Sequence, residues 1–175
     1  MIKMGRKTLP WVRSLFFASL LALLVNQFGF VLSVVNGYSM EPTLEDGDRL
    51  LVNKLAMVVD SPELGDVITF EDPGKENRYL VKRVVGLPGD RIEGKNGRVY
   101  RNNKPLRERY VESTLEDGDF GPIVVQAGTL FVLGDNRTQN ASRDSRYESV
   151  GLVPMDKVDG KVMLILWRPS LAASL

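Results

Sequence analysis

The hydrophobic pattern starts with one long apolar run and continues with short ones. Residues 14–35 carry no charged side chain, and only Asn26 and Gln27 interrupt the run with strongly polar groups. About 20 helical residues cross a hydrocarbon core of about 30 Å, so this run predicts a single transmembrane helix. The alternatives are a cleaved signal peptide, a buried core helix and an amphipathic surface helix. The run is longer than a signal-peptide core, lacks an Ala-x-Ala exit before Gly37 and shows no polar face, which favours the membrane anchor.

The charged residues on the two sides of this run differ in sign. The basic side chains before it are Lys3, Arg6, Lys7 and Arg13, and the acidic side chains after it are Glu41, Glu45, Asp46 and Asp48. The positive-inside rule keeps the basic side in the cytoplasm. The sequence therefore predicts a cytoplasmic segment at 1–13, a transmembrane signal anchor at 14–35 and an extracytoplasmic domain at 36–175, in a protein of the cytoplasmic membrane.

Beyond residue 35 the apolar residues come in short alternating runs. Such runs, separated by turn signals such as Asn96-Gly97, predict β-strands. Residues 91–106 suit a hairpin with positive-φ turns, inside an insertion of about 91–125, and residues 55–59 fit either a short helix or an apolar loop. The predicted fold class is mainly β, an antiparallel domain behind one N-terminal helix, with strands at 50–52, 66–70, 79–85, 98–100, 123–125, 129–133 and 160–167.

The composition removes several kinds of chemistry. The 175 residues include no histidine and no cysteine, which excludes imidazole and thiolate catalysis, disulfides and cysteine zinc sites. Scattered carboxylates such as Asp46 and Asp48 suit solvated turns better than a metal site, so neither a metal nor another cofactor is expected. With 23 basic and 22 acidic residues the net charge is +1, which gives no basis for nucleic-acid binding.

Lys82 is a candidate general base. In the expected strand 79–85, period-two alternation places Lys82 on one face with Leu80 and Val84, so hydrocarbon flanks the amine. Burial disfavours an ammonium ion and lowers its pKa from about 10.4 toward the working range of a base. The alternative is a lysine at a sheet edge whose amine reaches solvent.

Ser39 is a candidate nucleophile. A glycine two residues before it and a proline three residues after it suit a tight, rigid turn that presents the hydroxyl and nearby backbone N–H groups. A serine in such surroundings is usually only a turn residue. Because the chain has no imidazole, any acyl transfer needs a hydroxyl that another group activates, and the amine of Lys82 is the obvious choice.

Four segments resemble, in order and spacing, the boxes of the bacterial type I signal peptidases. They are residues 39–44, 64–70, 82–90, and 134–137 together with 144–146. The resemblance extends from the apolar run to about Trp167. It implies a signal-peptidase-like domain with a coiled β-barrel and a membrane-bound serine endopeptidase that uses a Ser-Lys dyad. Its partners would be the signal peptides of exported preproteins, which it removes, and the lipid bilayer.

The resemblance also implies roles for single residues. Ser39 would attack the scissile carbonyl, and Lys82 would take its proton and return it to the leaving amine. Gly37 stands where other members place a serine hydroxyl as second oxyanion donor, which leaves that role to backbone or water. Ser142 would orient the lysine amine. The expected supporting ion pairs are Asp135 with Arg83 and Asp144 with Arg146.

The same resemblance places the substrate pocket near the nucleophile. Signal peptides end in small residues, and shallow pockets would admit alanine while excluding larger side chains. The expected lining consists of Gly37, Met40, Leu44, Leu80 and Val81, for which the alternative is packing in the core.

One segment departs from the family's spacing. Residues 138–141 make the stretch between Arg137 and Ser142 two residues longer than usual. If this insertion bulges outward, Ser142 keeps its place; if it shifts the register, Ser145 takes that place.

Two other functions remain open. A self-cleaving Ser-Lys repressor would share a related β fold, but such proteins are soluble and the apolar run argues against them. A catalytically silent, membrane-anchored peptide-binding domain would share the anchor and the fold.

Overall fold

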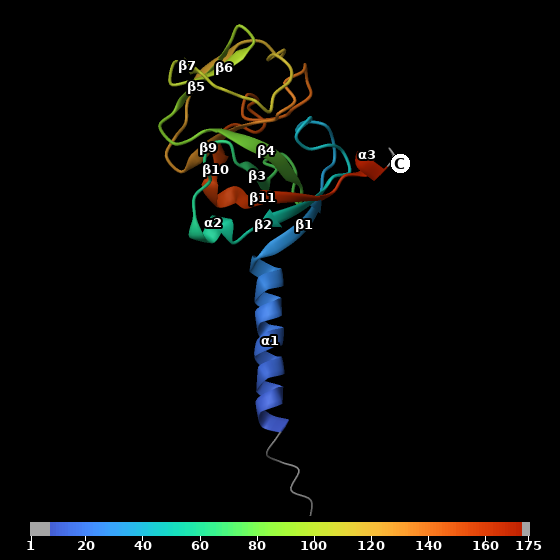
Figure 1. Cartoon of the computed structure of the whole chain (residues 1–175). Coiled ribbons are helices and arrows are strands. Elements are labelled where there is room, and N and C mark those ends of the chain that lie inside the picture. Colours follow the sequence, from blue (N-terminus) through green and yellow to red (C-terminus); the bar gives the residue numbers. More distant parts are fainter. Residues whose placement is uncertain (1–7, 173–175) are drawn as a thin grey trace, which may run out of the picture.

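The computed structural model describes residues 8–172, so residues 1–7 of the predicted cytoplasmic segment and 173–175 of the predicted domain lie outside the described residues. Helix α1 (Thr8–Phe28) projects from one end of a β domain, as Figure 1 shows. Within residues 8–172, no helix combines the length and the hydropathy that crossing a bilayer requires.

The helix ends earlier than the apolar run. Residues 30–34, which the sequence assigns to the transmembrane segment 14–35, form strand β1 (Phe30–Val34) instead. β1 pairs in antiparallel register with β2 (Arg49–Asn53). Side chains on one face of β1 stay exposed, Leu32 at 71% and Val34 at 53%. Because four of its five side chains are apolar, with Ser33 as the exception, its sequence lacks the alternation that marks a half-buried strand.

The main sheet has seven strands, and each neighbouring pair is antiparallel. This confirms the predicted mainly β, antiparallel fold. Its order is β1, β2, β11 (Val158–Trp167), β3 (Val67–Glu71), β4 (Tyr79–Gly86), β9 (Thr129–Leu133) and β10 (Val153–Pro154).

A second sheet occupies residues 91–124, where the sequence predicts a hairpin insertion. Two turns of this sheet use asparagines with positive φ, as expected: Asn96 at 51° before Gly97, and Asn102 at 51° with Asn103 at 66°. The sheet lies at the end of the domain farthest from α1 (Figure 1). Its order is β7 (Lys104–Pro105), β6 (Arg98–Arg101), β5 (Arg91–Lys95) and β8 (Phe120–Val124).

Three short helices complete the described chain. Helix α2 (Ala56–Val59) adopts the first of the two forms expected for residues 55–59. A 3-10 turn (Met155–Lys157) precedes β11, and α3 (Pro169–Ala172) follows it.

The buried apolar side chains form three clusters. One cluster, with Ile68, Leu80 and Val84, fills one side of β3 and β4. A second joins the two sheets around Ile92 and Phe131. The third packs the turn between β1 and β2 onto the main sheet and consists of Val35, Met40, Leu44, Leu50 and Val52. Each such side chain contributes about 2 kcal/mol by leaving water, so the clusters hold the strands that carry the candidate site.

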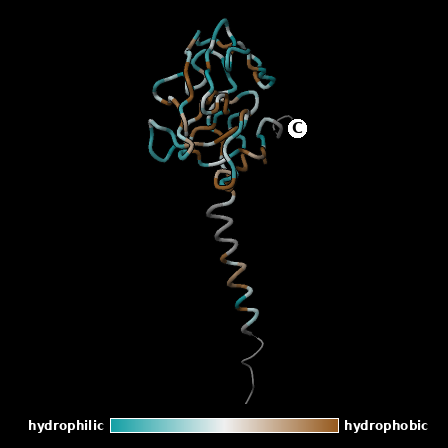
Figure 2. Tube along the Cα trace, turned by 90° about the vertical axis from the view of Figure 1, so that its left-hand side faces the viewer, coloured by the Kyte–Doolittle hydropathy of each residue, from teal (hydrophilic) through white to brown (hydrophobic). Residues whose placement is uncertain are grey.

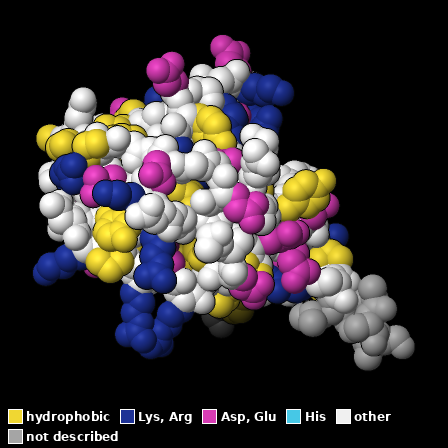
Figure 3. Space-filling view, turned by 90° about the horizontal axis from the view of Figure 1, so that it is seen from above, with side chains coloured by type: hydrophobic (Ala, Val, Ile, Leu, Met, Phe, Trp, Pro, Cys, Tyr) yellow, Lys and Arg dark blue, Asp and Glu magenta, His cyan; other side chains and the backbone are white. Residues whose placement is uncertain are grey.

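Exposed apolar side chains gather on β1 and on the last part of β11. Exposed apolar side chains continue from β1 to the end of β11, where Leu164, Leu166 and Trp167 are each more than half exposed. Figure 2 shows hydrophobic chain at the junction with α1, and Figure 3 shows that the opposite end carries mixed charges of both signs.

Candidate active site

The turn after β1 presents Ser39. Gly37 has a φ of +103°, a conformation that glycine adopts without strain, and its N–H donates to Asp46 Oδ1 at 2.6 Å. The N–H of Leu44 donates to the carbonyl of Met40 at 2.9 Å, and both side chains are almost fully buried. The turn is thereby fixed to the core while Ser39 itself stays half-buried.

Lys82 reaches this hydroxyl from strand β4. Its Nζ lies 2.6 Å from Ser39 Oγ and 2.8 Å from the carbonyl oxygen of Val81. The residue is 3% exposed, which rules out the alternative of an amine that reaches solvent. Leu80 and Val84 lie together in one apolar cluster, as expected for side chains on one face of the strand.

The surroundings of Lys82 lower its pKa to about 8. Burial is the largest cause, because a low-dielectric site disfavours the ammonium ion. The charges of Asp144 and Asp135 oppose this shift, and those of Arg143 and Arg78 assist it. With a pKa of about 8, about a tenth of the amine is neutral at pH 7 and able to accept a proton.

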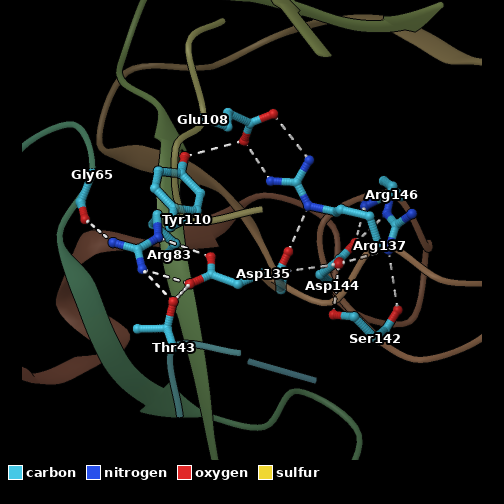
Figure 4. A network of polar contacts seen from close by, with 11 residues as sticks. Thr43, Gly65, Arg83, Glu108, Tyr110, Asp135, Arg137, Ser142, Asp144 and Arg146 are labelled. Atoms are coloured by element: carbon cyan, nitrogen blue, oxygen red, sulfur yellow. Dashed lines mark hydrogen bonds and ion pairs between the residues drawn. The ribbon is translucent and has the colours of Figure 1, made fainter. Parts of the chain in front are cut away.

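Arg83, the next residue, points to the opposite face and is paired. Its Nε lies 2.8 Å from Asp135 Oδ1 and its Nη2 2.5 Å from Oδ2, while Nη1 donates to the carbonyl of Gly65 at 2.8 Å. Thr43 Oγ1 donates to the same carboxylate at 2.6 Å. Figure 4 shows this group, which joins the nucleophile turn to β4 and to the loop after β9.

The other predicted ion pair also forms. Arg146 binds Asp144 through Nε at 2.8 Å and Nη2 at 2.9 Å. Ser142 Oγ donates to Asp144 Oδ2 at 2.7 Å and is buried, whereas Ser145 Oγ accepts the N–H of Val132. Ser142 therefore lies next to the carboxylate, and its role in orienting the amine of Lys82 stays a prediction.

The longer stretch at 138–141 turns toward the segment that precedes β8. Its Gln139 N–H donates to Glu116 Oε2 at 3.1 Å, and its Asn140 N–H donates to Asp117 Oδ1 at 2.8 Å. These contacts tie the insertion to the segment that precedes β8. The choice between Ser142 and Ser145 as the orienting hydroxyl stays a prediction.

The expected pocket residues divide between core and surface. Met40, Leu44 and Leu80 are 1%, 2% and 8% exposed and belong to apolar clusters, which favours core packing for these three. Val81 is half-buried, and open space faces the Cα of Gly37. The assignment of these residues to a substrate pocket stays a prediction.

Two residues at the site were missed in the sequence, although they lie in the segment 134–137. A side chain at Gly134 would overlap the carbonyl oxygen of Ser39 and the hydroxyl of Ser142. The N–H of Asn136 donates to that same Ser39 carbonyl at 3.1 Å, and its side-chain amide donates to the carbonyl of Tyr38 at 3.1 Å. Both residues thus fix the backbone of the nucleophile turn.

The described residues hold no group of three or more histidine, cysteine, aspartate or glutamate side chains placed to bind a metal ion. The site consists instead of a serine hydroxyl against a buried amine, within a frame of arginine–carboxylate pairs. On an antiparallel β domain without histidine, this arrangement is that of a serine hydrolase.

Comparison with known proteins identifies the family. The family model described as signal peptidase, peptidase S26, matches residues 8–167. The chain therefore belongs to the signal peptidase family, which confirms the predicted resemblance, and it is a serine endopeptidase.

Curated relatives agree with this family. The chain is 40% identical over 161 residues to "Signal peptidase I P" of Bacillus subtilis subsp. natto, covering 87% of this chain and 84% of the relative. It is 37% identical over 166 residues to "Signal peptidase I" of Bacillus licheniformis, covering 90% and 87%. Among solved structures, a signal peptidase I from Enterococcus faecalis V583 is similar with a TM-score of 0.51 and 30% identity, covering 60% of this chain and 99% of that one.

Proposed function

We propose that this protein cleaves signal peptides from exported preproteins, with Ser39 as nucleophile and Lys82 as general base. The observation that carries the proposal is the 2.6 Å contact between Lys82 Nζ and Ser39 Oγ, in a site where the pKa of the amine is lowered to about 8. The names of the relatives, which describe signal peptidases, support the substrate class.

The contact gives a balanced sequence of proton transfers. Neutral Lys82 takes the proton of Ser39 while Oγ bonds to the scissile carbonyl carbon. The ammonium then gives this proton to the leaving amine as the C–N bond breaks, which leaves an ester on Ser39. A water molecule that loses a proton to the same amine attacks the ester, and the proton returns to Oγ when the acid product leaves.

Backbone groups supply the oxyanion site in this mechanism. The N–H of Ser39 is one donor, and the open space beside Gly37 leaves room for a backbone group or a water as the second. The pairs Arg83–Asp135 and Arg146–Asp144 act as braces for the two segments that meet at Lys82. Ser142 orients the amine from the side of Asp144, with which it shares a hydrogen bond.

Small side chains at the end of the signal peptide are the specificity we assign. The substrate lies extended between the segment that leads into Ser39 and strand β4, where Gly37 and Val81 offer little bulk. Met40, Leu44 and Leu80 shape this surface from beneath through their packing.

Helix α1 attaches the enzyme to the membrane in this proposal. Its apolar side chains from Trp11 to Leu20 are exposed, and β1, which follows it directly, exposes Leu32 and Val34. The basic residues before the helix keep the N-terminus cytoplasmic, so the β domain faces outward. Carbonate-washed membranes should retain the full chain, and added protease should digest the β domain in spheroplasts but leave it intact inside inverted vesicles.

Cleavage of a preprotein by the purified full chain in detergent tests the activity. The wild-type protein should cut the preprotein after the signal peptide, and Ser39→Ala and Lys82→Ala should each abolish cutting while keeping the wild-type circular dichroism spectrum. Near-normal cutting by Lys82→Ala would remove the dyad. An intact preprotein after long incubation with wild-type protein would favour the peptide-binding alternative.

A further inference from the structure

A segment of the second sheet lies against the loop that carries much of the site. Residues 106–117, which we call the strap, connect β7 to β8, and hydrogen bonds join both ends of the strap to the hairpin β5–β6. The middle of the strap crosses to the loop 134–146 after β9. The frame of arginines around the site therefore has partners outside the segments on which the family resemblance rests.

Glu108 is the centre of this contact. Its Oε1 accepts a hydrogen bond from Arg137 Nη2 at 2.5 Å, and its Oε2 accepts one from Nη1 at 3.2 Å. The hydroxyl of Tyr110 donates to the same carboxylate at 3.1 Å (Figure 4). Arg137 is 1% exposed. Because a buried charge without a partner is far more costly in free energy than a surface charge, Arg137 needs the Glu108 carboxylate.

Arg137 in turn holds the residues that touch the nucleophile. Its Nε donates to the carbonyl of Gly134 at 2.6 Å. Gly134 lies against the carbonyl of Ser39, and Asn136, directly before Arg137, donates its N–H to that carbonyl at 3.1 Å. Loss of the charge that fixes Arg137 would thus release both contacts on the backbone of Ser39.

Tyr110 brings the strap into contact with Arg83 on β4. The guanidinium of Arg83 lies over the Tyr110 ring, 3.9 Å from its centre, where a cation is attracted to the aromatic face. Burial and the neighbouring Glu108 carboxylate raise the pKa of Tyr110, so its hydroxyl keeps its proton as a donor. The strap therefore contacts two arginines of the site, Arg83 through Tyr110 and Arg137 through Glu108.

The end of the strap fixes the far part of the loop. Asp117 accepts hydrogen bonds from Arg146 Nη1 at 2.8 Å and from the N–H of Asn140 at 2.8 Å. The backbone N–H of Glu116 donates to the carbonyl of Arg137 at 3.0 Å. The loop is thus held at its start, at its insertion and at its end.

We infer that Glu108 is a positioning residue for the reaction, which acts through Arg137 on the backbone of Ser39 with support from Tyr110. The inference rests on the proposed role of Ser39 as nucleophile. It assigns to the second sheet a part in catalysis, because the sheet supplies the strap that sets the distance between the hydroxyl and the amine.

Replacement of Glu108 by glutamine is the central test. Glutamine keeps the size of the side chain but removes its charge and turns an N–H group toward Arg137. Preprotein cleavage by the full-length variant should show kcat lowered by about tenfold to a hundredfold with KM within about twofold, as expected for a displaced nucleophile. Glu112→Gln makes the same chemical change at an exposed position of the strap and should leave both constants unchanged.

A double variant separates positioning from stability. Glu108→Leu with Arg137→Met replaces the buried pair with an apolar contact. The midpoint of thermal unfolding of this double variant should equal that of the wild type, while its kcat stays low. Recovery of kcat together with the midpoint would overturn the inference, since it would make the pair purely structural. Wild-type kcat in Glu108→Gln would overturn it as well, and neither result would affect the dyad.

A milder variant covers the case in which the others do not fold. Tyr110→Phe keeps the ring on Arg83 and removes only the hydroxyl that binds Glu108. We expect kcat to fall by about threefold with KM unchanged, in line with the loss of one hydrogen bond to a charged group. An unchanged kcat would contradict the role of the strap. If the wild-type protein itself failed to cut, the proposed function would be at fault rather than this inference.

Discussion

Lys82 and Arg83 are neighbours on one strand with opposite electrostatic surroundings. Both cations are almost fully buried, with exposed fractions of 3% and 9%. Lys82 faces a serine hydroxyl and a backbone carbonyl, and its pKa falls because burial outweighs the charges of Asp144 and Asp135. Burial also disfavours the charge of Arg83, but the hydrogen bonds and charge of Asp135 outweigh that effect and raise its pKa.

The difference shows how one strand supplies both a base and a brace. A buried amine without a directly bound carboxylate can lose its proton, which a general base must do. A buried guanidinium with a two-point carboxylate partner keeps its charge and fixes geometry. The alternation of the strand separates the two environments, although the residues are adjacent in sequence.

The same substitution at both positions should separate the two roles most clearly. Lys82→Met removes the amine but keeps an unbranched apolar side chain in an apolar site. We expect kcat to fall by about 10²- to 10⁴-fold, the usual contribution of a general base, with a free energy of unfolding equal to or above that of the wild type. Preprotein cleavage and urea denaturation measure the two quantities. More than a tenth of wild-type kcat would be incompatible with a base at this position.

Arg83→Met should show the reverse balance. It leaves the buried carboxylate of Asp135 with Thr43 as its one remaining side-chain partner among residues 8–172, so we expect the free energy of unfolding to fall by about 3–5 kcal/mol. Urea denaturation gives this value. As a control, Arg83→Met combined with Asp135→Leu removes both charges and should recover most of the loss. A stable single variant would mean that Asp135 finds another partner.

Lys82 should also make stability depend on pH. Its pKa is about 8 in the folded protein and 10.5 ordinarily, so between these values the unfolded chain binds a proton that the folded protein does not. Stability therefore rises with pH across this window, and below it the buried ammonium lowers stability by about 3 kcal/mol. The free energy of unfolding of the wild type minus that of Lys82→Met should increase between pH 7 and pH 10. A constant difference would place the amine in water.

The features that follow from local pattern were predictable from the sequence. The strand around Lys82 alternates clearly, so its apolar face and the opposite direction of Arg83 follow from the spacing of the residues alone. Ser39 could be proposed because Gly37 and Pro42 mark a rigid turn. The pairing of Arg83 with Asp135 came from the family resemblance, since no local rule joins residues that far apart.

Other features depend on contacts that no local pattern reveals. Strand β1 was included in the predicted helix 14–35 because four of its five side chains are apolar, and its pairing with β2 is visible only in three dimensions. The strap is irregular, so nothing in the sequence places Glu108 beside Arg137. Gly134 and Asn136 stand in a segment that the resemblance singles out, but their contacts with the backbone of Ser39 appear only in three dimensions.

The smallest expected effect is that of more distant charges on the pKa of Lys82. Arg143 and Arg78 both bind the buried carboxylate of Asp72, and their positive charges help to lower the pKa of Lys82. The acidic limb of the pH profile of kcat/KM, which reports the deprotonation of Lys82 in the free enzyme, should lie near pH 8. Arg143→Gln removes a positive charge that disfavours the ammonium form of Lys82. The pKa of Lys82 should therefore rise, and the limb should move to higher pH by a fraction of a unit.

Arg78→Gln should move the limb in the same direction and less far, because Arg78 is half exposed and its charge is better screened by solvent. Glu76→Gln, an exposed change in the same turn, is the matched control and should leave the profile in place. Loss of Arg143 by itself should raise the pKa of Lys82. A shift of the limb to lower pH in Arg143→Gln would therefore mean that the substitution moves Asp144 away from the amine. The amine would then be controlled by the position of the loop rather than by the sum of the charges around it.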